Sequence, residues 1–166
     1  MEIERVWAMP SRHTFTIAPI ARLIQREIPA GEKWVDAFAG FNSPAFYTND
    51  LNPASPAVSH QDAVVFLRGF SCDSVDGVLF DAPYSPRQLK ECYDNIGQSL
   101  HDTKASVWAS WKDEIARIIR PLGKCISFGW NTNGLGIGRG FIMERVLLVA
   151  HGGMHNDTIV TVEKKL

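Results

Sequence analysis

Four consecutive residues, Asp81, Ala82, Pro83 and Tyr84, follow directly after the apolar run at residues 75–80. They bring a carboxylate, a backbone carbonyl and an aromatic ring into one short segment. Fixed oxygen acceptors can bind the N–H groups of an amine and stabilise positive charge that develops on it, and an aromatic ring can stack on a planar group. The alternative is structural: the segment is a proline-containing turn in which Asp81 caps the next helix.

Three shorter apolar runs earlier in the chain also stop at polar positions. Their acidic ends are Asp36, Asp50 and Asp62, after runs at residues 33–35, 45–48 and 57–60. Buried strands of an α/β sheet commonly end in this way, with their carboxyl ends along one ligand crevice. We therefore expect the four acidic ends to meet at one edge of a sheet.

Helical periodicity occupies much of the remaining chain. Residues 14–28 carry their isoleucines on one stripe, with Thr14 or Thr16 as the expected N-cap. Further helices are expected at residues 62–70, 86–97 and 105–120, and further strands at residues 124–129, 141–150 and 158–163. The last two strands are joined by a short glycine-containing segment and should form a hairpin.

The order of these elements predicts the fold class. A helix is followed by alternating strands and helices and then by a terminal hairpin, which is typical of a doubly wound α/β sheet. The length of 166 residues fits a single domain spanning residues 1–166, and no linker-like tract divides the chain.

The segment Asp81-Ala82-Pro83-Tyr84 resembles the signature of the amino-methyltransferases, in which Asn, Asp or Ser precedes Pro-Pro and an aromatic residue. The resemblance implies a Rossmann-like class I methyltransferase fold, with a mostly parallel sheet and a terminal antiparallel hairpin. It also makes these four residues catalytic. Asp81 and the carbonyl of Ala82 would accept the N–H bonds of the target amine, and Tyr84 would stack on a base flipped out of a duplex.

The same resemblance implies a site for S-adenosylmethionine. Asp36, Ala37, Phe38 and Gly40 resemble the motif after the family's first strand, whose turn passes close to the methionine part of the cofactor. A glycine leaves room for that approach.

Two further positions are assigned to this cofactor by the resemblance. Asp50, followed by Leu51, would bind the ribose hydroxyls, and Asp62, followed by Ala63, would meet the adenine amine of the cofactor. An N-terminal motif found in one sub-group adds Pro10, Thr14 and Phe15.

The likeness extends over nearly the whole chain. The segments at residues 85–97, 123–134 and 147–164 resemble compact adenine-methylase-like proteins of phages and mobile elements. Ala37 and Ala82 depart from the family pattern, because both stand where the family has proline, and proline would fix φ.

Two other departures concern length. Asp50 lies only fourteen positions after Asp36, which leaves too little chain for the usual helix between the first two strands. No long insertion follows Tyr84. We therefore expect no separate target-recognition domain and a relaxed sequence preference.

Arg87, Lys90 and Lys104 are candidates for contacts with a nucleic-acid strand, with Trp108 and Trp111 adding aromatic surface. The alternative is an exposed helix face above two core tryptophans. The late cluster of His151, His155 and Asp157 imitates a metal site, but its glycine pair favours a hairpin turn, and we expect no metal.

The bulk properties restrict the choice of function. A formal net charge of −1 lacks the broad basic surface of a stoichiometric nucleic-acid binder but is compatible with transient binding. The three cysteines have neither pairing nor metal-ligand spacing, and no apolar run could span a membrane. A cytoplasmic protein is expected.

The leading interpretation is an enzyme that methylates the exocyclic amine of adenine in DNA. It would act alone, as a homodimer or with a partner that supplies specificity. The same arrangement of acceptors would serve an RNA base or a protein amide. A cofactor-binding or DNA-binding module that has lost catalysis is the remaining alternative.

Overall fold

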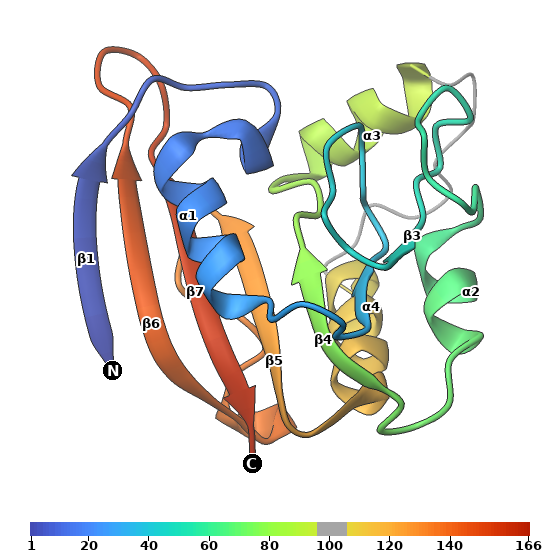
Figure 1. Cartoon of the computed structure of the whole chain (residues 1–166). Coiled ribbons are helices and arrows are strands. Elements are labelled where there is room, and N and C mark those ends of the chain that lie inside the picture. The colour runs from blue at the N-terminus through green and yellow to red at the C-terminus, as the bar shows by residue number, and fades with distance from the viewer. Residues whose placement is uncertain (96–105) are drawn as a thin grey trace.

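The computed structural model describes residues 1–95 and 106–166. In this part of the chain, seven strands form one sheet in the order β1-β6-β7-β5-β4-β2-β3 (Figure 1). The strands are β1 (Glu2–Trp7), β2 (Trp34–Asp36), β3 (Tyr47–Thr48), β4 (Val75–Phe80), β5 (Ile119–Gly129), β6 (Phe141–Ala150) and β7 (Thr158–Lys165). The α-helices are α1 (Ala18–Glu27), α2 (Ala63–Arg68), α3 (Pro86–Asn95) and α4 (Ser106–Ile118), with 3-10 turns at Thr14–Thr16 and Ile137–Arg139.

Strand directions follow the expected pattern. β2, β3, β4 and β5 run parallel to their neighbours among these four strands, and β1 runs parallel to β6. β7 is antiparallel to both β5 and β6. The structure therefore confirms a mostly parallel α/β sheet with a terminal antiparallel hairpin.

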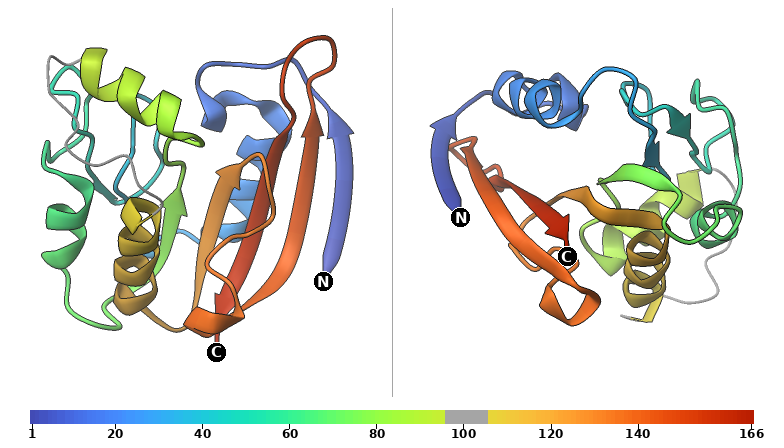
Figure 2. Two further views of the ribbon diagram at one scale, coloured as in Figure 1. Left: turned by 180° about the vertical axis from the view of Figure 1, so that it is seen from behind. Right: turned by 60° about the horizontal axis from the view of Figure 1, so that its bottom comes forward.

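Helices cover both faces of the sheet, α1 on one side and α4 on the other (Figure 2). Successive side chains of a strand point to opposite faces, and β4 uses both. Val78 and Phe80 pack in the cluster that contains α2 and α4, whereas Leu79 packs in the cluster that contains α1. This double burial explains why residues 75–80 form a nearly continuous apolar run.

The first helix begins later than its periodicity predicts. Residues 14–16 form a separate 3-10 turn, and α1 starts at Ala18 with Pro19 in its first turn. The N-cap is Ile17, which makes no side-chain capping bond, so the predicted cap at Thr14 or Thr16 was wrong. The Thr16 hydroxyl instead donates to the carbonyl of His13, which belongs to the preceding turn.

The strands also differ from the prediction in several places. β1 was not predicted, because its mostly exposed residues lack apolar alternation and its pairing partner lies in β6. The run at residues 57–60 forms only a parallel bridge between Asn49 and Ser59. β5 begins at Ile119 rather than residue 124, directly after α4 ends at Ile118, and Ile119 already pairs with Val75 of β4.

The turn of the hairpin, at residues 151–157, contains the glycine pair that predicted it. Gly152 and Gly153 have φ values of 68° and 59°, which favour glycine. His151 uses both ring nitrogens within the fold, one with the carbonyl of Ala8 and one with the Thr158 hydroxyl. Within the described residues there is no cluster of three metal-ligating side chains, and no helix is long and apolar enough to cross a membrane.

Candidate functional site

A cavity of about 660 Å³ lies at the carboxyl ends of β2, β3 and β4. This volume falls in the usual range of small-molecule sites, and the position is the one expected for ligands of open α/β sheets. The predicted cofactor residues that line the cavity are Thr14, Ala37, Phe38, Gly40, Asp50, Leu51 and Ala63, and all four residues of the Asp81–Tyr84 segment line it as well.

Asp36 organises the wall after β2 from behind. Its carboxyl group is fully buried and does not line the cavity. Its Oδ1 accepts the amide of Phe38 at 2.9 Å, and its Oδ2 accepts the Ser43 hydroxyl at 2.6 Å. Burial raises its pKa to about 7, opposed by these hydrogen bonds and reinforced by Asp81 and Asp50. Asp36 therefore shapes the turn rather than forming the cavity surface.

Asp50 joins the two loops of the next wall. Its Oδ2 accepts the amide of Gly40 at 2.8 Å, and its Oδ1 accepts the amide of Asn52 at 2.8 Å. Gly40 has a φ of 53°, which a residue with a side chain adopts at a cost. The short connection between β2 and β3 is thus held by the carboxylate that was predicted to bind a ribose.

Asn49 links three segments beneath this wall and was not singled out by its sequence. Its Nδ2 donates to the carbonyls of Ala37 and Gln61, and its Oδ1 accepts the amide of Gln61 at 2.9 Å. The residue is completely buried. Its position next to Asp50, at the end of a strand, could have indicated a role at the site.

Asp62 does not line the cavity. Its Oδ1 instead accepts the amides of Val64 at 2.9 Å and Val65 at 3.3 Å, so that Asp62 is the N-cap of α2. This local use of an aspartate before a helix is common. Gln61 and Ala63, on either side of Asp62, line the cavity.

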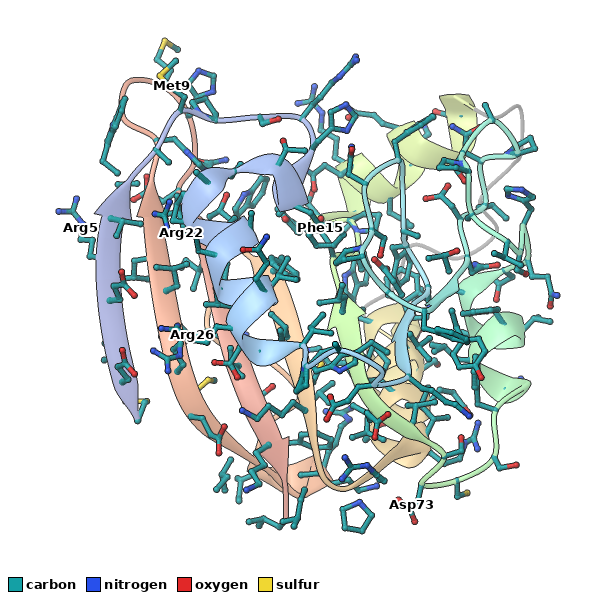
Figure 3. All side chains as sticks on the ribbon, viewed as in Figure 1. Arg5, Met9, Phe15, Arg22, Arg26 and Asp73 are labelled. Atoms are coloured by element: carbon teal, nitrogen blue, oxygen red, sulfur yellow. The ribbon has the colours of Figure 1, made fainter. Side chains whose placement is uncertain are left out.

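The predicted N-terminal residues separate into two groups. Thr14 lines the cavity together with Ser11 and Arg12. Pro10 and Phe15 do not line it, and Phe15 lies beside α1 with its ring edge-to-face on Phe128 (Figure 3). Arg12 is a cationic residue among those that line the cavity. The sequence did not indicate this position, because Arg12 is a single residue outside the predicted motifs.

Two of the catalytic candidates, Asp81 and Tyr84, are joined by a hydrogen bond. The Tyr84 hydroxyl donates to Oδ1 of Asp81 at 2.6 Å. Burial raises the pKa of Asp81, and the Tyr84 and Thr14 hydroxyl groups oppose that rise. The hydrogen bond from Tyr84 orients the carboxylate, and Thr14 lines the same cavity.

The peptide group between Pro83 and Tyr84 is held by hydrogen bonds at both its carbonyl and its amide. The indole Nε1 of Trp108 donates to the carbonyl of Pro83 at 3.0 Å, and the amide of Tyr84 donates to Oε1 of Gln88 at 2.7 Å. Ala82 is buried. Neither Trp108 nor Gln88 was predicted to hold this segment.

Arg87 and Lys90, two of the predicted nucleic-acid contacts, do not line the cavity, whereas Trp111 does. Arg87 is exposed and pairs with Glu91 at 2.8 Å along the surface of α3, and Lys90 is also exposed. Lys104 lies outside the described residues. Trp111 is a core residue, as the structural alternative predicted.

No protein-family model and no curated protein sequence matches the chain. Solved structures do match its fold. TrmN from Thermus thermophilus is 19% identical, with a TM-score of 0.58 over 90% of this chain and 49% of that chain. This chain thus spans about half the length of TrmN.

Two other solved structures are matched over a larger share of their own length. The 1,6-didemethyltoxoflavin-N1-methyltransferase of Burkholderia thailandensis, solved with S-adenosylhomocysteine, is 12% identical, with a TM-score of 0.60 over 89% of this chain and 76% of that chain. A putative rRNA-methylase from Clostridium thermocellum is 10% identical, with a TM-score of 0.55 over 94% and 100%. The strand order and these likenesses together give the conclusion that the chain has the class I methyltransferase fold.

Proposed function

We propose that the chain binds S-adenosylmethionine in the 660 Å³ cavity and transfers its methyl group to the exocyclic amine of adenine in DNA. The observation that carries the proposal is the position of Asp81 and Ala82. Both line the cavity that would hold the cofactor, and both belong to a segment fixed by hydrogen bonds. Similar folds solved as methyltransferases support methyl transfer.

The lining of the cavity fits the cofactor chemically. S-adenosylmethionine carries a carboxylate, an ammonium group, a sulfonium centre and a ribose diol. Arg12 offers a guanidinium for the carboxylate, and Asp50 offers negative charge to the ammonium group or the diol. The apolar lining from Ile17, Phe38 and Leu51 suits the adenosine ring.

The protein would make the amine more nucleophilic by accepting its hydrogens. The lone pair of an aromatic amine is delocalised into the ring, and an amine bound to two fixed acceptors approaches a tetrahedral geometry. Asp81 and the Ala82 carbonyl are the proposed acceptors, and they stabilise the positive charge that develops on nitrogen. The bound cofactor supplies the methyl group, so that a carbon–sulfur bond breaks as the carbon–nitrogen bond forms and one amine proton leaves.

RNA is the second candidate substrate, because one protein of similar fold is described as a putative rRNA-methylase. We also propose that the protein contacts DNA transiently, methylates adenine with a relaxed sequence preference and acts in the cytoplasm. A homodimer or a partner that supplies specificity remains a prediction. Arg87 and Lys90 would contact the strand only beyond the cavity mouth, since neither lines it.

Methyl transfer is tested by incubating the protein with isotopically labelled S-adenosylmethionine and either DNA or RNA, followed by mass spectrometry of the nucleosides. Labelled N6-methyldeoxyadenosine supports the proposal. Label only in RNA would move the assignment to the second candidate. No label in either nucleic acid, under conditions in which the cofactor binds, would refute both.

A further inference from the structure

A second cavity, of about 110 Å³, lies against the same Ala82-Pro83-Tyr84 segment as the large cavity. Its walls come from the end of β4, from α4 and from the loop after β5. The aromatic lining residues are Phe80, Tyr84, Trp108, Phe128 and Trp130, and the polar side chains are Lys112, Ser127 and Asn131. Three of the four catalytic candidates, Ala82, Pro83 and Tyr84, therefore line both cavities.

Aromatic rings dominate one side of this second cavity. The rings of Tyr84 and Trp130 lie 5.5 Å apart at 71° to each other. Trp130 is 42% exposed, so that its ring is accessible to a ligand. Trp108 is fixed by its bond to Pro83. Such walls suit a flat ring, because aromatic surfaces provide large contact areas at low conformational cost.

Lys112 supplies the cation of this cavity. It lies one helical turn after Trp108, so the two side chains share a face of α4. No hydrogen bond or ion pair joins its ammonium group to another group of the described structure. The nearby charges are engaged elsewhere: Glu163 accepts the amides of Leu135 and Gly136, and Arg139 pairs with Asp113.

The ammonium group of Lys112 is therefore available to a ligand. Burial and the positive charge of Arg139 lower the pKa of Lys112, while Cys125 and Glu163 oppose that effect. The side chain is partly exposed and lines the cavity, so a ligand atom that accepts its hydrogen bond would gain a charge-assisted contact.

We infer that the second cavity receives the ring of an amine-bearing nucleobase and that Lys112 donates a hydrogen bond to an acceptor atom on the edge of that ring. The inference rests on the proposed function for the identity of the base. The amine would then lie against the Ala82-Pro83-Tyr84 segment, and Lys112 would select bases by a ring nitrogen or carbonyl. Lys112 is thus a specificity residue distinct from the acceptors of the amine.

Binding of an adenine-containing oligodeoxynucleotide tests this inference directly. The probe is (dA)12, titrated in the presence of S-adenosylhomocysteine and followed by quenching of tryptophan fluorescence. Lys112→Met should weaken binding by about 10- to 100-fold, the scale for losing a hydrogen bond from a charged group. The matched control is Lys33→Met, which removes an equal charge at an exposed position that lines neither cavity. It should leave the affinity unchanged.

Base analogues identify the atom that Lys112 contacts. The titration is repeated with oligonucleotides in which adenine is replaced by 1-deaza-, 3-deaza- or 7-deazaadenine, each of which lacks one ring nitrogen. One analogue should weaken binding to the wild type and cause no further loss in Lys112→Met. Equal affinity of Lys112→Met and the wild type would overturn the inference, as would losses that add fully for all three analogues. If this dependence on Lys112 is found but no methyl group is transferred, the site stands and the proposed function fails.

Discussion

The indole Nε1 of Trp108 donates a 3.0 Å hydrogen bond to the carbonyl oxygen of Pro83, and so joins α4 to the loop after β4. The next amide, that of Tyr84, is bound by Gln88 of α3. Ala82 stands immediately before this fixed peptide, where related signatures have a proline that restricts φ. Contacts from α3 and α4 thus constrain a segment that has no proline ring at position 82.

Trp108→Phe should therefore lower kcat while leaving the affinity for S-adenosylhomocysteine unchanged. Loss of one hydrogen bond from a positioned backbone predicts a decrease of about tenfold. Adding Ala82→Pro should restore most of the rate, because the proline ring limits the same backbone. Single-turnover kinetics of the four combinations measure this coupling. Equal losses with and without the proline would contradict a positioning role for Trp108.

The hydrogen bond between Tyr84 and Asp81 changes what is expected of Tyr84→Phe. Stacking alone would make this substitution mild, but the hydroxyl donates to Asp81 at 2.6 Å and lowers the pKa of that carboxyl group. Its loss should raise that pKa further. The rate of Tyr84→Phe should then fall at a higher pH than the wild-type rate as the solution is acidified, with near-normal rates in alkaline solution. Superimposable pH–rate profiles would show that the hydroxyl does not control Asp81.

Asp81 itself should be needed for the chemical step rather than for cofactor binding. Asp81→Ala is expected to reduce kcat by about 10²-fold or more, the scale for removing one preorganised polar group. Asp81→Asn keeps an acceptor oxygen and should retain more activity. Calorimetry should give similar affinities for S-adenosylhomocysteine in all three proteins. A wild-type rate in Asp81→Ala would exclude this carboxylate as an acceptor of the amine.

Asp36 should make the stability of the protein dependent on pH. Its pKa is 3.8 when unperturbed and about 7 in the fold. Between these values the folded state binds a proton that the unfolded state has lost, so the free energy of unfolding falls as pH rises, by up to roughly 1.4 kcal/mol per pH unit.

Asp36→Asn tests this dependence. An amide can accept the Phe38 N–H and donate to the Ser43 hydroxyl, which preserves the local contacts. Urea unfolding at pH 5.5 and pH 8 should show a smaller loss of stability in the variant than in the wild type. An identical pH dependence would mean that Asp36 titrates as an ordinary carboxyl group.

The fold was predictable where apolar side chains report burial on both faces, as at Val78 and Leu79 of β4. β1 was not predictable in this way, because an exposed edge strand is defined by its pairing with β6 rather than by its own pattern. The start of β5 was missed because Pro121 indicates a turn after the helix, whereas in the structure Pro121 lies inside the strand.

The sequence predicted which residues line the large cavity where they follow the end of a strand. Asp50 and the Asp81–Tyr84 segment both line it. The sequence did not predict the lining where a side chain has a stronger local role, as for Asp62 at the start of α2. It also failed where a contact crosses long distances in the chain, as for Trp108 and Pro83, since no sequence period connects them.

Calorimetric titration with S-adenosylhomocysteine tests most directly whether the large cavity is a cofactor site. The wild type should bind one equivalent, and Asp50→Ala should bind at least about tenfold more weakly, through loss of ribose contacts and of the bond to Gly40. Val58→Ala, at an exposed position outside the cavity lining, is the matched control and should bind normally. Absence of binding by the folded wild type at millimolar ligand would contradict the proposed function.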